Sequence, residues 1–199
     1  MRRTSGFAVV AIVLAASACG GTSKSTATSP GTPRTVGPPA GASQRARSAA
    51  LVKKAQGDFA KGRFNLAKDE FKAALEQNAN NKYGWYGLGV IAQDAKNMSQ
   101  ARTGYENAIA IDPHFESALY NYGVLLYSEN DLDQAVTYLD RAVQENDTDA
   151  NAHWNLGLAL AKRNHGDDSK RSTVELNKGL KLNPRLARGI AATPSTTAP

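Results

Sequence analysis

Histidine is the side chain of this 199-residue sequence best suited to acid–base catalysis or metal binding, and it occurs at positions 114, 153 and 165. His165 has two carboxylates close by, Asp167 and Asp168, and such a group could hold a cation. No two histidines have the spacing that places a pair of metal ligands on one helix face, and no nucleophile motif or phosphate-binding glycine loop is present. The sequence therefore predicts a noncatalytic protein without metal or cofactor. An enzyme or small-molecule binder that uses His165 and Asp168 is the less favoured alternative.

Cys19 is the only cysteine, which excludes an intramolecular disulfide framework and a zinc finger. It follows a basic start, an uncharged apolar run over residues 7–18, and the small residues Ala16, Ser17 and Ala18. The apolar run is shorter than the roughly 20 residues that span a bilayer, and it is typical of a secretory signal. The segment resembles the lipobox of bacterial lipoproteins. This resemblance implies that residues 1–18 are a signal peptide and that Cys19 carries fatty acyl chains such as palmitate; an ordinary secretory signal is the alternative.

The flanks of the sequence differ in composition from its centre. Residues 20–46 contain one large apolar side chain, Val36, so we expect residues 19–47 to form a disordered Ser/Thr/Pro/Gly linker, and residues 187–199 a disordered tail. The net charge of +6 comes entirely from residues 1–47, which hold six bases and no acid. The remainder is neutral overall, which excludes the basic footprint of a nucleic-acid-binding protein.

From residue 48 onward, small and large residues recur with a period of 34. The small residues stand at Ala55, Gly89, Gly123 and Gly157, at Ala67, Ala101 and Ala135, and at Ala74, Ala108 and Ala142. The fourth copy continues at Ser172 and Leu176 with a shift of 37, so three extra residues lie within residues 162–171. Within each copy, small and apolar residues fall at i, i+3, i+4 and i+7, which predicts two amphipathic helices.

The second copy carries the clearest pattern: Trp85, Leu88, Gly89, Ala101, Tyr105, Ala108 and Pro113. These residues and the 34-residue period resemble the tetratricopeptide (TPR) repeat. The resemblance implies an all-α, right-handed α-solenoid of about four helix-turn-helix repeats. We expect this TPR domain to span residues 48–186, with repeats at about 48–81, 82–115, 116–149 and 150–186.

A second stripe on the first helix of each repeat lies about 120° from the packing stripe. Its members are Tyr83, Tyr86, Val90, Tyr120, Val124, Tyr127, Trp154 and Leu158. Residues at these places in TPR proteins line a concave groove, so the resemblance implies that they bind a peptide or helix. Packing between repeats, or filling of the groove by the protein's own tail or linker, is the alternative. The family's carboxylate clamp is absent, because Val52, Gln56 and Gly87 occupy its positions, so an acidic tail is not the expected ligand.

Together these features predict an extracytoplasmic scaffold or assembly factor, lipid-anchored to the bacterial cell membrane, whose partner is another cell-envelope protein. A self-assembling spacer is the alternative. Charge adds one asymmetry: residues 116–149 hold eight acids and one base, and residues 162–188 hold eight bases and three acids. We interpret both as solvated convex faces, with a dipolar surface that orients a partner as the alternative.

Overall fold

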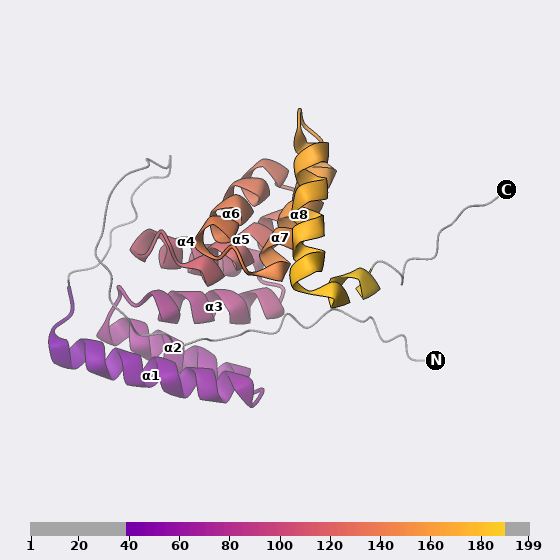
Figure 1. The fold of residues 1–199 in the computed structure, drawn as a ribbon. Coiled ribbons are helices and arrows are strands. Elements are labelled where there is room, and N and C mark those ends of the chain that lie inside the picture. The colour runs from indigo at the N-terminus through magenta and orange to yellow at the C-terminus, as the bar shows by residue number, and fades with distance from the viewer. Residues whose placement is uncertain (1–38, 190–199) are drawn as a thin grey trace, which may run out of the picture. The chain divides into compact units, whose positions relative to one another are not determined.

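The computed structural model describes residues 39–189, so the predicted signal peptide, Cys19, the linker up to residue 38 and the tail from residue 190 lie outside it. The described residues form eight α-helices and one short 3-10 helix (Figure 1). In chain order these are α1 (Ala42–Ala60), α2 (Phe64–Gln77), α3 (Lys82–Asp94), α4 (Met98–Ile111), α5 (Glu116–Ser128), α6 (Leu132–Glu145), α7 (Ala150–Arg163), α8 (Asp168–Leu182) and η1 (Pro184–Gly189). Among these helices, none is both long enough and apolar enough to cross a membrane.

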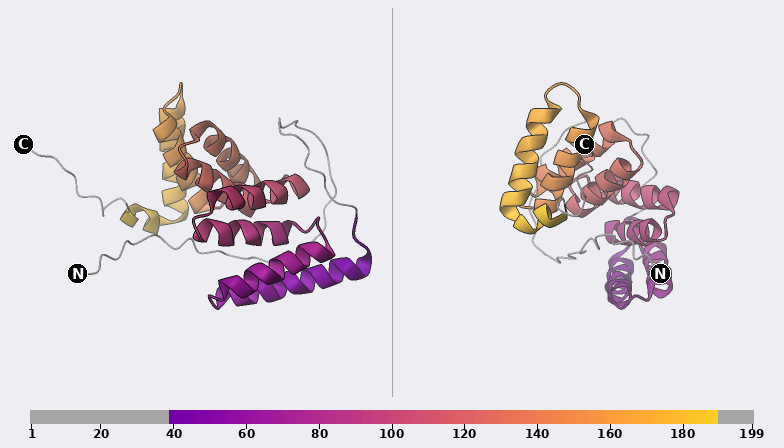
Figure 2. Two further views of the ribbon diagram at one scale, coloured as in Figure 1. Left: turned by 180° about the vertical axis from the view of Figure 1, so that it is seen from behind. Right: turned by 90° about the vertical axis from the view of Figure 1, so that its right-hand side faces the viewer.

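The helices pack in consecutive pairs, which we number repeats 1 to 4: α1 with α2, α3 with α4, α5 with α6, and α7 with α8. Each second helix also packs against the first helix of the next repeat, so the repeats stack in chain order (Figure 2). The first helices contact one another as well, α1 with α3, α3 with α5, and α5 with α7. The predicted fold class, an all-α solenoid of four helix-turn-helix repeats, is confirmed.

Two kinds of turn recur in every repeat, and each has a local chemical cause. Between the first and second helices, a residue with positive φ recurs every 34 positions, at Gly62, Lys96, Asn130 and Asn164. Glycine and asparagine adopt this left-handed conformation most readily. Second helices end at an Asn or Asp whose side-chain oxygen accepts the backbone N–H two residues on, at Asn78, Asp112, Asn146 and Asn183. This bond stabilises the turn and stops the helix.

Small residues in the core let the paired helices approach closely. The alanines of the repeating columns, such as Ala101 and Ala135, are completely buried. At Gly104 the approach is closer still, because a Cβ there would lie 2.6 Å from the backbone nitrogen of Gly89. In repeat 4, Ser172 stands in the alanine column, and its hydroxyl donates a hydrogen bond of 2.8 Å to the carbonyl oxygen of Gly157.

Helix α1 begins at Ala42, six residues before the predicted start of the repeat domain at residue 48, so the end of the predicted linker is helical. These residues lack large apolar side chains, but alanine, glutamine and arginine are good helix formers. The side chain of Gln44 also accepts the backbone N–H of Gly41 at 2.9 Å, which fixes the helix start. At the other end, η1 extends three residues beyond the predicted domain end at residue 186.

The three inserted residues of repeat 4 are shared among its elements. Helix α7 has 14 residues where α3 and α5 have 13, and α8 has 15 where α4 and α6 have 14. The turn between α7 and α8, residues 164–167, is one residue longer than the corresponding turns of repeats 2 and 3. The insertion therefore lengthens repeat 4 without changing its plan.

Candidate partner-binding face

The residues predicted to bind a partner lie on the first helices α3, α5 and α7, which contact one another in turn. Five of the eight keep accessible side chains: Tyr83 is 42% exposed, and Val124, Tyr127, Trp154 and Leu158 are half-buried. We call these five residues the first-helix face. It combines aromatic and aliphatic surface, which is the chemistry that dominates protein–protein contacts.

The other three predicted contact residues are buried, which corrects the expectation that their side chains face outward. Tyr86, Val90 and Tyr120 are only 6%, 7% and 9% exposed. The first helices of neighbouring repeats lie in contact, so this column is covered by the next first helix. Tyr86 and Tyr120 also take hydrogen bonds from the next repeat, so these two side chains contribute to packing between repeats.

Two hydrogen bonds show how the buried tyrosines join the repeats. Asn121 Nδ2 donates to the Tyr86 hydroxyl at 2.8 Å, and Asn155 Nδ2 donates to the Tyr120 hydroxyl at 3.0 Å. Both pairs are separated by 35 residues, so each bond links one repeat to the next. Burial raises the pKa of both tyrosines above the usual range, and the nearby Glu116 adds to the effect. The phenols therefore stay neutral, and both bonds persist at physiological pH.

An aromatic cluster borders the first-helix face at the start of α3 and α5. The ring of Phe115 packs edge-on against Tyr83 and Tyr86, with centroids 5.3 and 5.2 Å apart. The ammonium of Lys82 lies 4.8 Å from the Phe115 ring centroid and pairs with Asp112. Sequence reasoning missed Phe115. The sequence did carry a signal for it, because Phe115 stands 34 residues from both Asn81 and Asp149. Those two residues cap the first helices of the neighbouring repeats, so a ring at this position is a departure from the pattern.

Acidic groups occupy the same border one repeat further along. The Asp149 carboxylate accepts the backbone N–H groups of Asn151 and Ala152, at 2.8 and 3.3 Å, and so caps α7. Burial raises the pKa of the Glu116 carboxyl, and the proximity of Asp149 raises it further. This border is therefore unfavourable for another anion.

A cation–π contact joins α5 to α7 within the first-helix face. The ammonium of Lys162 lies 5.0 Å from the centroid of the Tyr127 ring. Lys162 is exposed and Tyr127 is half-buried, so both groups remain within reach of a bound chain.

The cation site considered for the turn of repeat 4 is not supported by the geometry. Asp168 is buried, and its carboxylate accepts Arg163 Nε at 2.7 Å and Arg163 Nη2 at 2.8 Å. It also accepts the backbone N–H of His165 at 3.0 Å. Arg163 holds the pKa of the Asp168 carboxyl well below its usual range. Asp168 is therefore already engaged, and the described residues contain no cluster of three side chains suited to a metal ion.

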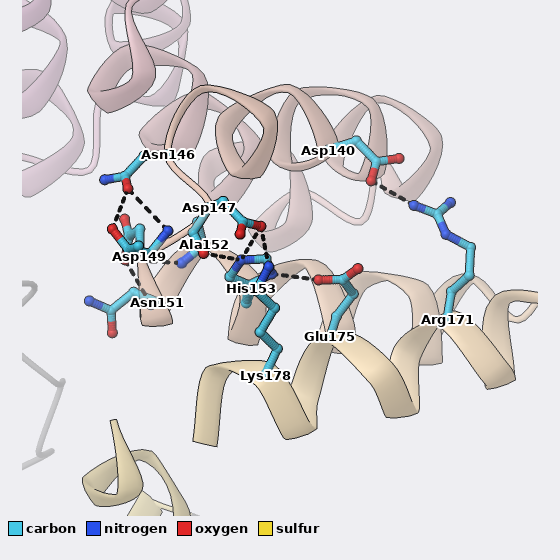
Figure 3. Close-up of polar contacts among 11 residues, drawn as sticks. Asp140, Asn146, Asp147, Asp149, Asn151, Ala152, His153, Arg171, Glu175 and Lys178 are labelled. Carbon is cyan, nitrogen blue, oxygen red and sulfur yellow. Dashed lines mark hydrogen bonds and ion pairs between the residues drawn. The ribbon is translucent and has the colours of Figure 1, made fainter. Parts of the chain in front are cut away.

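His153 of α7 lies in a polar cluster with Glu175 of α8 and Asp147 of the turn that precedes α7 (Figure 3). Its Nδ1 is 2.5 Å from a Glu175 carboxylate oxygen, and its Nε2 is 3.1 Å from the backbone carbonyl of Asp147. Lys178 pairs with the Asp147 carboxylate. His153 is only 2% exposed and both ring nitrogens have partners within the fold, so its role is structural.

The acidic stretch of residues 116–149 and the basic stretch of residues 162–188 are joined by ion pairs. Acids of repeat 3 pair with bases of repeat 4: Arg171 lies 2.6 Å from Asp140, and Lys178 pairs with Asp147 (Figure 3). Arg163 adds a third contact, at 3.4 Å, to Asp133 of α6. Three of the eight acids and three of the eight bases thus join neighbouring repeats.

Paired helices stacked in chain order, closely packed small residues and a recurring inter-helix turn define an α-helical repeat protein. Two family models described as "Tetratricopeptide repeat" match the chain, over residues 52–114 and 94–162. Together they span more than half of the sequence, and the chain therefore belongs to the tetratricopeptide repeat proteins.

Solved structures share this fold at low sequence identity. The Pseudomonas aeruginosa pilF structure matches with a TM-score of 0.64 and 23% identity, over 72% of this chain and 64% of that one. YrrB, described as a TPR protein with an unusual peptide-binding site, matches with a TM-score of 0.60 and 20% identity, over 76% and 75%. The first TPR of Spaghetti (RPAP3), bound to the HSP90 peptide SRMEEVD, matches with a TM-score of 0.58 and 15% identity, over 60% and 98%. No curated protein matches the sequence.

Proposed function

We propose that this protein is a noncatalytic scaffold or assembly factor of the bacterial cell envelope, attached to the membrane through lipid on Cys19. Its first-helix face binds a peptide or helix of another envelope protein. TPR proteins are generally scaffolds for protein–protein interaction, and two of the structural relatives bind peptides according to their descriptions. The signal-like residues 1–18 and the following cysteine support the membrane attachment.

The observation that carries the binding proposal is the contrast within one column of first-helix residues. Tyr86 and Tyr120 are buried and hydrogen-bonded between repeats, whereas Trp154, one period further along, is half-buried. Trp154 lies on the last repeat, where the described chain has no further first helix to cover it. The indole and the neighbouring Leu158 thus offer apolar surface on a rigid support, which favours binding.

The charges around the face indicate the chemistry of the partner. The carboxyl groups of Glu116 and Asp149 border it, and the proximity of Asp149 adds to the effect of burial in raising the pKa of Glu116. A segment with apolar or aromatic side chains and a basic residue is therefore the favoured ligand. An acidic C-terminal tail is disfavoured, because the added negative charge would meet these carboxylates without a basic clamp.

The binding proposal is tested with the double variant Tyr127→Ala, Trp154→Ala. The partner is first identified by crosslinking in intact cells and mass spectrometry, and its affinity for the purified chain is then measured. We expect the double variant to bind at least about tenfold more weakly, since buried aromatic contacts dominate such interfaces. The matched control is Val174→Ala, which truncates an exposed apolar side chain on α8 and should leave the affinity unchanged. Unchanged affinity in the double variant, with unchanged helical content, would rule out the face.

The proposed attachment of lipid to Cys19 is tested separately in the same cells. The unaltered chain should incorporate labelled palmitate and fractionate with membranes, and Cys19→Ser should abolish the label. Label that persists in Cys19→Ser would contradict the assignment of the lipid to this residue.

A further inference from the structure

The turn between α1 and α2 exposes an unusual amount of apolar surface. Five large apolar side chains are exposed in the described residues, and two of them, Phe64 at 46% and Leu66 at 44%, lie at the start of α2. The half-buried ring of Phe59 packs edge-on against Phe64, with centroids 5.2 Å apart. The apolar surface is therefore continuous from the end of α1 to the start of α2.

The fold itself does not require this apolar surface. Leu66 falls in a column that holds Gln100 in repeat 2 and Gln134 in repeat 3, where the same turn and helix form with a polar side chain. The position of Phe64 is apolar in every one of the first three repeats, but its counterparts Met98 and Leu132 are only half-exposed. The excess apolar surface is thus specific to repeat 1.

The charge of this turn is also specific to repeat 1. Residues 59–68 hold three bases and no acid, whereas residues 127–136, the matching stretch of repeat 3, hold three acids and no base. Lys61 is exposed, and the side chain of Arg63 is 51% exposed even though it pairs with Asp58. The exposed side chains of Phe64 and Leu66 and these two bases thus lie within six residues of one another at the same turn.

We propose that this turn is a membrane-contact site that takes the anionic headgroup surface of a bilayer. We define the turn patch as Phe59, Lys61, Arg63, Phe64, Leu66 and Lys68. Apolar side chains that enter the boundary between headgroups and acyl chains, with bases paired to anionic lipids, are the pattern of interfacial membrane binding. The site rests on the proposed function in one respect, because it requires that the chain lie next to a membrane.

The length of chain before α1 permits this contact. Helix α1 has 19 residues and is therefore about 28 Å long, and the turn patch lies at the end remote from the linker. Cys19 precedes Ala42 by 23 residues, which reach up to about 75 Å when extended. A lipid on Cys19 would thus hold the turn patch within reach of the same bilayer. Attachment through one point raises the effective concentration at the second, so a weak contact suffices.

The test uses the processed chain, from residue 19 onward, with Cys19→Ser so that no lipid is attached. Its binding to phosphatidylcholine vesicles with and without phosphatidylglycerol is measured by cosedimentation. We expect the chain to bind the vesicles that contain phosphatidylglycerol and not those of phosphatidylcholine alone. The bound fraction should decrease as the salt concentration is raised. The variant Lys61→Glu, Leu66→Gln should bind about tenfold more weakly, because it removes one basic and one apolar contact.

The matched control is Val174→Gln, which makes a more exposed apolar site on α8 polar, 62% against 44% for Leu66, and should bind vesicles like the parent chain. Thermal unfolding followed by circular dichroism checks that each variant is folded. Equal vesicle binding by the turn variant and the parent, or no preference for anionic vesicles, overturns the proposal. A folded parent chain that binds no vesicles, but binds a purified protein at the turn patch, also overturns it.

This result is separable from the outcome for the proposed function. Failure of the vesicle test leaves palmitate labelling of Cys19 and partner binding at Tyr127 and Trp154 unaffected. Conversely, a chain that incorporates no palmitate can still show the vesicle binding of its turn patch.

Discussion

Repeats 1 and 3 share one backbone plan but fill it with different chemistry. Repeat 3 has Tyr122, Leu126 and Tyr138 in columns where repeat 1 has Lys54, Asp58 and Glu70. In repeat 3 the rings of Tyr122 and Tyr138 pack 4.7 Å apart, and Leu126 is completely buried. In repeat 1, Lys54 Nζ lies 2.7 Å from a Glu70 carboxylate oxygen, and Asp58 pairs with Arg63.

The cause of the difference lies in what precedes each repeat. The hydroxyl of Tyr122 donates to Glu106 at 2.8 Å and accepts from Arg102 at 3.1 Å, and both partners belong to α4 of the preceding repeat. Lys54 occupies the same column at the start of the solenoid, and its side chain is 65% exposed. A terminal repeat needs a polar outer face, and the exposed ammonium of Lys54, paired with the buried Glu70, provides one at the first described repeat.

The largest effect is expected from a truncation inside repeat 3. Leu126→Ala should lower the free energy of unfolding by about 2–5 kcal/mol, because it leaves a cavity in a closed apolar core. Asp58→Ala, in the same column of repeat 1, should cost less, because its partner Arg63 has a side chain that is 51% exposed and can be hydrated instead. Urea denaturation of both variants measures the difference. A larger loss for Asp58→Ala would show that the ion pairs of repeat 1 form a core equivalent to the apolar one.

A smaller effect is expected at the bonds between repeats. Tyr86→Phe should lower the free energy of unfolding by about 1 kcal/mol, because Asn121 loses its tyrosine acceptor. Tyr120→Phe should cost less, because Asn155 Nδ2 also donates to the backbone carbonyl of Asn151 at 3.0 Å. Repeat 1 has Val52 in this column and no such bond to make. Thermal denaturation of the two variants distinguishes them, and an equal loss would remove the role given to Asn151.

The smallest effect concerns the Asp–Arg pairs in the turns of repeats 1 and 4. Arg163 lowers the pKa of Asp168, and Arg63 lowers the pKa of Asp58. Each pair therefore stabilises the fold above the ordinary aspartate pKa of about 4, and this stability is lost as the pH falls through the lower folded value.

Asp168→Asn should accordingly destabilise at neutral pH and converge with the parent chain in acid. Asp58→Asn should do so less, because Asp168 accepts two arginine bonds and a backbone N–H. Free energies of unfolding between pH 7 and pH 2 measure both. A pH-independent difference between Asp168→Asn and the parent would contradict the charge-based explanation.

The sequence predicts the repeats well because small residues recur every 34 positions, where the two helices of a repeat pack too closely for larger side chains. The columns that contain Ala101, Ala108 and Gly89 are conspicuous at a spacing of 34, and the structure buries them as expected. The start of α1 was missed because a short stretch of alanine, glutamine and arginine resembles a linker in composition, although it favours a helix.

The face was predicted only in part, because angular position on a helix does not show what covers it. Tyr86 and Tyr120 lie on the predicted stripe, but contact between neighbouring first helices buries them. The asparagines at positions 121 and 155 carried the missing signal, since each stands one period and one residue after a tyrosine and can supply its hydrogen bond. That pairing links residues 35 apart, which helix periodicity does not reveal.

The tyrosine–asparagine bonds have a consequence for how such a chain can change in length. Each joins residues that are 35 apart in the sequence, which is one period plus one residue. Excision of residues 87–120 would therefore place Asn155 at this same sequence separation from Tyr86. Loss of this 34-residue unit would thus leave a matching donor and acceptor at the new junction. Descendants of this gene could therefore lose this unit without having to evolve new junction chemistry.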